Sequence, residues 1–266
     1  MSLAALTKGV LVTGVGAPPG LGTLRSLRGA DPALTLVAAD INPLAGGMFE
    51  PGTQSVVLPS AGDPEAYRSA VKAVCEARGL DIIIPGSEAE IAALAPVARS
   101  WTEAGLRVPV ADPEVIAFGI DKGLLLDRVK AVGLPHPQTL QPGCEADLAQ
   151  WSGGFPCVVK PRTSRGARGV SYPANARELA AIWRDTAAEH GQCVVQQRIP
   201  GGADTVYTIG SLWNHGQLVV STLHRKLQTN PPSGGVAVAG ETVVDPALMA
   251  AGVAVLEASG PWPGLA

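Results

Sequence analysis

The sequence has 266 residues, of which 46% are hydrophobic and only 16% charged, a composition typical of a folded globular protein rather than a disordered chain. Its net charge of −3 at pH 7 gives no basic field, which argues against nucleic acid or an anionic membrane surface as a partner. No apolar run approaches the roughly 20 residues that cross a bilayer, and the N-terminus lacks the pattern of a secretory signal.

Cysteine and histidine spacing predicts neither a disulfide framework nor a metal site. The four cysteines are scattered without a C-x-x-C pair, and the four histidines form no pair at ligand spacing. Cys157 and Cys193 each open an apolar run, which favours small buried thiols. We therefore expect a cytoplasmic protein with reduced cysteines.

The first part of the chain alternates apolar strands with helical patterns. Four apolar runs predict strands, at residues 10–12, 34–39, 55–58 and 82–84. Between the last two, apolar residues at i, i+4 and i+7 predict an amphipathic helix, at Tyr67, Val71 and Val74. Ser87 predicts the N-cap of the next helix, and Glu90 completes a capping box. This alternation indicates βαβ units and a parallel sheet with helices on both faces, an α/β arrangement.

The order of elements changes after residue 111, where we place a domain boundary. Two helical stretches follow, the second ending at Gly133. Further apolar runs predict strands, at residues 157–159, 170–172 and 194–197, with a helix around Leu179 and Trp183 before the last of them. Residues 205–226 predict a hairpin with its turn at Asn214-His215-Gly216, and a final helix carries Leu248, Ala251 and Val255. This order is typical of an α+β domain.

A first glycine-rich loop follows the first predicted strand, from Thr13 to Gly22. Asp40, at the end of the second strand, stands where a dinucleotide fold has its ribose-binding acid. However, Pro18 and Pro19 occupy the turn and remove two backbone N–H donors that a pyrophosphate would need. The loop favours an ordinary βα turn, and an NAD-dependent oxidoreductase is the alternative.

A second glycine-rich loop carries the stronger signal. Lys160 ends an apolar strand and is followed by Pro161, so its charge can be presented to a phosphate at little ordering cost. Within the loop, Gly166 and Gly169 let backbone N–H groups approach phosphate oxygens, and Ser164 adds a hydroxyl donor. Three arginines add positive charge: Arg162, Arg165 and Arg168. The loop predicts a phosphate site.

A site for the base and ribose is indicated further along the chain. It lies in the segment from Gln197 to Asp204, which follows the apolar strand around Val194. An adenine requires an apolar slot beside a backbone strip with a donor and an acceptor, which Gln197 to Ile199 can supply. An acid facing the ribose hydroxyls is supplied by Asp204. The segment predicts the nucleoside end of the site.

The ordered set of these motifs resembles the ATP-grasp superfamily. It runs through Asp121-Lys122, Gly133-Leu134-Pro135-His136-Pro137, the Lys160 strand with its loop, and the segment from Gln196 to Asp204. The resemblance covers nearly the whole chain and is closest to the branch similar to the carbamoyl-phosphate synthase large chain and the pyrrolysine-biosynthesis ligase. It implies a Rossmann-like pre-ATP-grasp domain over residues 1–111 and an ATP-grasp domain over residues 112–266. A small nucleotide-lid subdomain would span residues 136–197.

The resemblance also implies roles for individual residues around ATP. Lys122 and Lys160 would hold the phosphates, beneath a loop that includes Ser164, Arg165, Gly166 and Gly169. The adenine would be lined by three consecutive residues, Gln197, Arg198 and Ile199, and the ribose bound by Asp204. Gln197 and Asp204 stand where the family usually has glutamate. Arg225 and Gly235 are the candidates for the substrate side, although Arg225 equally fits a solvated strand-end arginine beside Lys226.

The family's magnesium ligands lie beyond its last helix, and here the sequence after that helix reaches Ala266 without such acids. We therefore expect an incomplete ATP-grasp domain that holds ATP but lacks the ligands of the family's Mg²⁺. The parent reaction implied is ADP-forming ligation of a small-molecule carboxylate to an amine through an acylphosphate, with this stretch inactive by itself. A non-catalytic nucleotide-binding half of a split enzyme, completed by a second polypeptide, is a further alternative.

Overall fold

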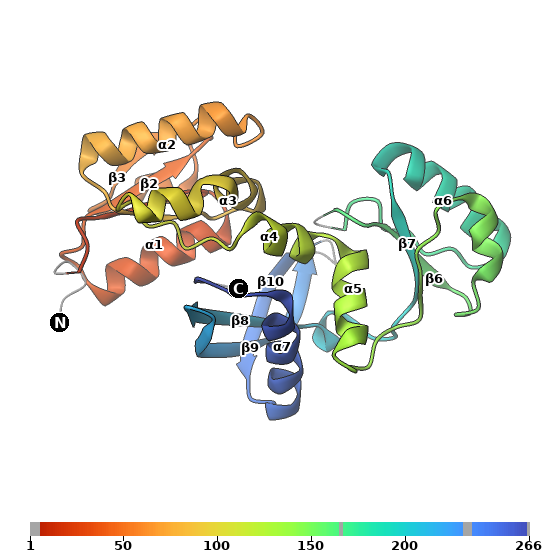
Figure 1. Cartoon of the computed structure of the whole chain (residues 1–266). Coiled ribbons are helices and arrows are strands. Elements are labelled where there is room, and N and C mark those ends of the chain that lie inside the picture. The colour runs from red at the N-terminus through yellow and green to blue at the C-terminus, as the bar shows by residue number, and fades with distance from the viewer. Residues whose placement is uncertain (1–5, 165–166, 231–235, 265–266) are drawn as a thin grey trace. The chain divides into compact units, whose positions relative to one another are not determined.

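The computed structural model describes residues 6–164, 167–230 and 236–264. The chain divides into two compact units, Met1–Ile116 and Ala117–Ala266 (Figure 1). The division lies close to the boundary that the sequence suggests after residue 111, and the assignment of the units to named domains stays a prediction.

The first unit is built on a four-stranded parallel sheet with the order β3-β2-β1-β4. Its strands are β1 (Val10–Val12), β2 (Leu36–Asp40), β3 (Gln54–Val57) and β4 (Ile82–Ile84), which confirms the four predicted strands. Its helices are α1 (Pro18–Ala30), α2 (Pro64–Arg78) and α3 (Glu88–Glu103), with a short 3-10 helix η2 (Gly46–Phe49) after β2. The predicted parallel α/β sheet is therefore confirmed.

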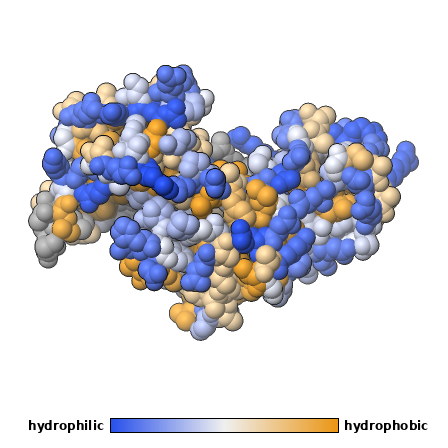
Figure 2. Space-filling model, in the orientation of Figure 1, coloured by the Kyte–Doolittle hydropathy of each residue, from blue (hydrophilic) through white to orange (hydrophobic). Residues whose placement is uncertain are grey.

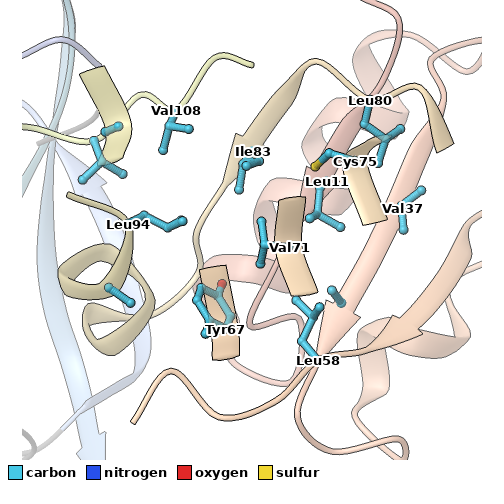
Figure 3. Close-up of a cluster of buried hydrophobic side chains, with 14 of the residues drawn as sticks. Leu11, Val37, Leu58, Tyr67, Val71, Cys75, Leu80, Ile83, Leu94 and Val108 are labelled. Atoms are coloured by element: carbon cyan, nitrogen blue, oxygen red, sulfur yellow. The ribbon is translucent and has the colours of Figure 1, made fainter. Parts of the chain in front are cut away.

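Helices cover both faces of this sheet, because successive residues of each strand point to opposite sides. Leu11, Val37 and Ile83 pack in one core, which also contains Tyr67 and Val71 of α2 and Leu94 of α3 (Figure 3). The neighbouring strand residues face a second core that α1 covers, with members that include Val10, Val12, Ala38 and Leu24. Burial on both faces explains why the strands read as continuous apolar runs.

A buried acid lies where β4 leads into α3. Ser87 caps α3 as predicted, since its hydroxyl accepts a hydrogen bond from the Glu90 N–H at 3.3 Å. The Glu90 side chain does not complete the predicted capping box, because the backbone N–H that its carboxylate accepts from is that of Gly86, at 3.2 Å, and not that of Ser87. Glu90 is only 7% exposed, and this burial raises the pKa of its carboxyl. Glu90 therefore contacts the loop residue Gly86, which precedes the N-cap residue Ser87.

We expect Glu90→Gln to stabilise the first unit at neutral pH. Because the folded-state pKa is raised above the ordinary 4.5, the folded chain binds a proton that the unfolded chain has lost, and stability falls as the pH rises above that value. The amide keeps an oxygen acceptor for Gly86 without the buried charge. Thermal unfolding at about pH 7.5 and about pH 4.5 checks this. A lower midpoint for the variant at the higher pH would contradict it.

The second unit contains two three-stranded antiparallel sheets, β5-β7-β6 and β10-β9-β8. The first part comprises α5 (Lys122–Ala131), β5 (Thr139–Leu140), η3 (Glu145–Gln150), β6 (Cys157–Pro161), α6 (Ala176–His190) and β7 (Cys193–Gln197). The second comprises η4 (Ala203–Thr205), β8 (Tyr207–Asn214), β9 (Gln217–Asn230), β10 (Val236–Val243) and α7 (Pro246–Ser259). Helix α4 (Pro113–Ile120) runs across the division between the units.

The sheet β5-β7-β6 packs against α6 (Figure 1). Its core includes Cys157 and Cys193, so the predicted buried thiols are confirmed. The strand predicted at residues 170–172 is wrong, because only Ser171 forms a bridge, to Val159 of β6. The next ladder position is Pro173, whose carbonyl accepts from the Cys157 N–H but which has no N–H to return. The pairing therefore stops after one bridge.

The predicted hairpin is confirmed as β8 and β9. Its turn has positive φ at both central residues, 49° at His215 and 75° at Gly216, which is the combination that matches the twist of the flanking strands. Helix α7 packs against this sheet closely enough that a Cβ at Gly252 would overlap Ile209. Figure 2 shows hydrophilic residues spread over the visible surface, with smaller apolar areas between them. Among the described residues, every helix is too short or too polar to cross a bilayer.

Candidate functional site

Two lysines from different elements line one pocket of the second unit. Lys122 begins α5, and Lys160 is the fourth residue of β6. The pocket has a volume of about 190 Å³, and its wall is completed by residues of α5, the following loop and β7: Leu125, Leu126, Val129, Pro135, His136, Pro137 and Gln196. The structure thus brings together the two predicted phosphate lysines beside an apolar wall.

Lys160 carries its charge in a half-buried position. Its Nζ donates to Gln196 Oε1 at 2.7 Å, and Gln196 Nε2 donates in turn to Thr139 Oγ1 at 2.9 Å. Burial lowers the pKa of the Lys160 ammonium, and the positive charge of Lys122 lowers it further. Gln196 is a neutral amide, so its hydrogen bond with Lys160 does not balance the charge. An anion at this position would balance it.

Lys122 is held against the start of the glycine-rich loop. Its Nζ donates to the Ser164 carbonyl at 2.6 Å, and its own N–H donates to the Arg162 carbonyl at 3.0 Å. The Ser164 hydroxyl lies 3.4 Å from the same ammonium. Lys122 and Ser164 are therefore neighbours, and their roles toward phosphates stay predictions.

Gly169 fulfils a steric requirement at the far end of this loop. Its φ is 70°, and a Cβ there would lie 2.7 Å from Pro161 Cγ. A side chain would therefore meet both an unfavourable backbone conformation and the end of β6. Arg165 and Gly166, which the sequence also assigns to the phosphate site, lie outside the described residues.

The predicted adenine and ribose residues lie outside the pocket lining. Gln197 is exposed, and its N–H donates to the Gln138 carbonyl at 2.8 Å. The Arg198 guanidinium lies 5.4 Å from the ring centre of Tyr172, and Ile199 is 62% exposed. Asp204 is exposed on η4. Their roles toward a nucleoside stay predictions, to which the structure adds Tyr172 as an exposed aromatic neighbour.

On the predicted substrate side, Arg225 pairs with an acid of the adjacent strand. Its Nε donates to Glu241 Oε1 at 2.8 Å across β9 and β10. Glu241 therefore balances the charge of Arg225 without a substrate, and the assignment of Arg225 to a substrate carboxylate stays a prediction. Gly235, the other candidate, lies outside the described residues.

The acids near the end of the chain have structural partners. Glu241 pairs with Arg225, and Asp245 caps α7 by accepting from the N–H groups of Ala247 and Leu248 at 3.0 Å each. Residues 6–164, 167–230 and 236–264 contain no group of three or more His, Cys, Asp or Glu side chains arranged to hold a metal ion. Glu241 and Asp245, each held by a structural partner, do not fit a Mg²⁺ site. The expected lack of metal ligands in the whole chain stays a prediction.

The first glycine-rich loop is closed by its own hydrogen bonds. Asp40 Oδ2 accepts from the Gly16 N–H at 2.7 Å, and Oδ1 accepts from the Asn42 N–H at 2.9 Å. An anionic carboxylate therefore already lies at a loop N–H that a pyrophosphate would use. This arrangement favours the βα turn over the dinucleotide site.

Sequence reasoning gave no individual role to Arg162, Gln196 or Thr139. Gln196 rather than Gln197 lines the pocket, because alternate residues of a strand face opposite sides. The pairing of β6 with β7 would have identified it, since Gln196 lies opposite Val158 and next to Lys160 across the sheet. Thr139 lies on the two-residue strand β5, which is too short to give a sequence pattern.

No protein-family model matches the sequence. The chain is 33% identical over 92 residues to the D-alanine–D-alanine ligase of Pseudomonas putida, a match that covers 34% of this chain and 29% of that ligase. The matched part is thus less than a third of the relative's length.

Two solved structures are similar over nearly the whole chain. The L-amino acid ligase from Bacillus licheniformis has a TM-score of 0.67 at 16% identity, over 97% of this chain and 61% of that one. The biotin carboxylase–β-γ-ATP complex from Campylobacter jejuni has a TM-score of 0.73 at 14% identity, over 99% of this chain and 62% of that one. These likenesses show a shared mixed α/β fold. Together with the sequence match they support the ATP-grasp resemblance at the level of the superfamily.

Proposed function

We propose that this chain binds ATP as the nucleotide-binding part of an ATP-dependent carboxylate–amine ligase. The observation that carries the proposal is the meeting of Lys122 and Lys160 at one pocket, from elements that are separate in the sequence. Two ammonium groups beside a glycine-containing loop are a typical environment for phosphate oxygens. The match to a D-alanine–D-alanine ligase and the fold shared with an L-amino acid ligase support the same reaction class.

The proposed chemistry is ADP-forming. A substrate carboxylate oxygen attacks the γ-phosphorus of ATP, the bond from that phosphorus to the bridging β–γ oxygen breaks, and ADP leaves. An amine then adds to the carbonyl carbon of the acylphosphate, loses a proton, and displaces inorganic phosphate. Lys122 and Lys160 would place positive charge beside the phosphates. The lid over residues 136–197 would keep water from the acylphosphate.

The finer parts of the proposal come from the sequence resemblance. They are the branch similar to the carbamoyl-phosphate synthase large chain, the inactivity of these 266 residues alone, and completion of the site by a second polypeptide. ADP release with Mg²⁺ and a panel of amino-acid pairs tests the inactivity. Turnover by the 266-residue chain alone would contradict it.

We expect saturable, stoichiometric binding of ATP to the purified chain and none of NADH. Isothermal titration calorimetry with each ligand measures this. ADP should bind and adenosine should bind more weakly, because the lysines act on phosphates. Tight NADH binding without ATP binding would instead favour the oxidoreductase alternative and the first glycine-rich loop.

A further inference from the structure

Arg162 follows Lys160 by two residues and is the first of the three arginines that the sequence groups with the second glycine-rich loop. The structure gives its guanidinium another partner. Arg162 Nε donates to Asp121 Oδ1 at 2.8 Å, and Nη2 lies 2.8 Å from Asp121 Oδ2. Both oxygens of the carboxylate are engaged in a two-pronged contact, and the two side chains are only 19% and 18% exposed.

Asp121 is also the N-cap of α5. Its Oδ1 accepts from the N–H groups of Gly123 at 2.8 Å and Leu124 at 3.2 Å. Burial alone would raise the pKa of Asp121, but the hydrogen bonds from Arg162 and the two N–H groups outweigh burial, so its pKa lies below the usual value. The carboxylate is therefore charged at neutral pH and connects Arg162 directly to the first turn of the helix.

The remaining contacts of Arg162 fix the end of β6. Its N–H donates to the Gln192 carbonyl at 2.8 Å, and Nη1 donates to Gln192 Oε1 at 3.1 Å. Its carbonyl accepts from the Lys122 N–H at 3.0 Å. One residue thus contacts the start of α5, the segment before β7 and, through its own backbone, the start of the glycine-rich loop.

The helix leaves room for this guanidinium only because residue 123 is glycine. A Cβ at Gly123 would lie 2.8 Å from Arg162 Nε and 2.9 Å from Cζ. These distances are shorter than van der Waals contact, and Gln141 Oε1 would lie nearer still, at 2.5 Å, so a larger residue would require Arg162 and Gln141 to shift.

We propose that Arg162 is a positioning residue for nucleotide binding, which holds Lys122 and the start of the glycine-rich loop beside Lys160 without contacting the phosphates itself. The inference rests on the proposed function. Its physical basis is that the arginine's charge is balanced by Asp121, whereas its bonds connect the two elements that carry the lysines.

Arg162→Ala should weaken ATP binding about five- to tenfold, within the range for residues that share one hydrogen-bond network. Asp121→Asn, which keeps an N-cap, should weaken it similarly, and the double variant should be no worse than Arg162→Ala. Arg162→Lys should restore part of the affinity. Adenosine binding, followed by saturation-transfer NMR, should be unchanged in all four, which loss of folding would not allow.

The matched control is Arg184→Ala. Arg184 lies in the same unit and makes the same bidentate contact with a carboxylate, that of Glu145, at 3.0 and 2.8 Å. Both of these side chains are exposed, and the contact does not involve an element that carries a pocket lysine. Arg184→Ala should leave ATP affinity unchanged. Tighter ATP binding by Asp121→Asn would show that Arg162 reaches the phosphates, and would overturn the positioning role. Unchanged ATP binding by either Asp121→Asn or Arg162→Ala would overturn it as well. A wild-type chain that binds no ATP would overturn the proposed function and this inference together.

Discussion

Lys160→Ala should weaken ATP binding by about 1.5–3 kcal/mol, the range for a hydrogen bond to a charged group. The ammonium is half-buried at the end of β6 and lies beside a second positive charge, Lys122. Bringing two like charges together costs free energy that a bound triphosphate would offset, so the loss should appear with ATP and ADP. Calorimetry on the folded variant measures it.

A lysine on the same helix as Lys122 provides the control. Lys130 is exposed, lies 3.8 Å from Asp127 within α5, and does not line the pocket. Lys130→Ala should leave ATP affinity unchanged. Equal losses for the two variants would indicate a general charge effect, and unchanged affinity in a folded Lys160→Ala would remove Lys160 from the site.

Lys160→Met separates binding from folding. In the folded state the pKa of Lys160 is lowered from the ordinary 10.5. Between the lowered pKa and 10.5 the unfolded chain binds more protons than the folded chain, so the free energy of unfolding rises with pH over that range. At lower pH the buried charge costs stability. The methionine keeps most of the side-chain volume without the charge, so the variant should be at least as stable as wild type at neutral pH while binding ATP poorly.

The sequence predicts best where a signal is local and repeated. Apolar runs located the four parallel strands, and the His215-Gly216 pair located the hairpin turn, because both depend on neighbouring residues alone. The placement of Lys122 and Lys160 at one pocket came from the resemblance to a family, since periodicity contains no information on which elements meet. In the structure both lysines line one pocket, and their role toward phosphates stays a prediction.

The features that could not be predicted from the sequence depend on contacts between elements that are far apart in the chain. The choice between Gln196 and Gln197 is a choice of sheet face, and the apolar residues before them do not fix it. Arg162 was grouped with the loop arginines because its carboxylate partner, Asp121, is distant in the sequence. The strand predicted at residues 170–172 failed because a single proline, Pro173, ends the ladder.

Gly20→Ala should destabilise the first unit, although alanine is the better helix former. Gly20 lies in the first turn of α1, and a Cβ there would overlap the Gly14 carbonyl oxygen and lie 2.7 Å from that of Thr13. These are backbone atoms at the end of β1, so relief requires the helix to move from the sheet. Such overpacking costs about 1–3 kcal/mol. The tight contact also explains why the first glycine-rich loop can need its glycines without binding a dinucleotide.

Gly22→Ala, two residues further along the same helix, is the matched comparison. Nothing lies within 4 Å of a Cβ at Gly22, so this change should stabilise the unit by about 0.5–1 kcal/mol through helix propensity alone. Because the chain has two units, amide hydrogen exchange of β1 and β2 is a better measure than one melting temperature. We expect faster exchange for Gly20→Ala and slower exchange for Gly22→Ala. Exchange shifted the same way in both variants would mean that α1 does not pack on the Gly14 turn as closely as the structure indicates.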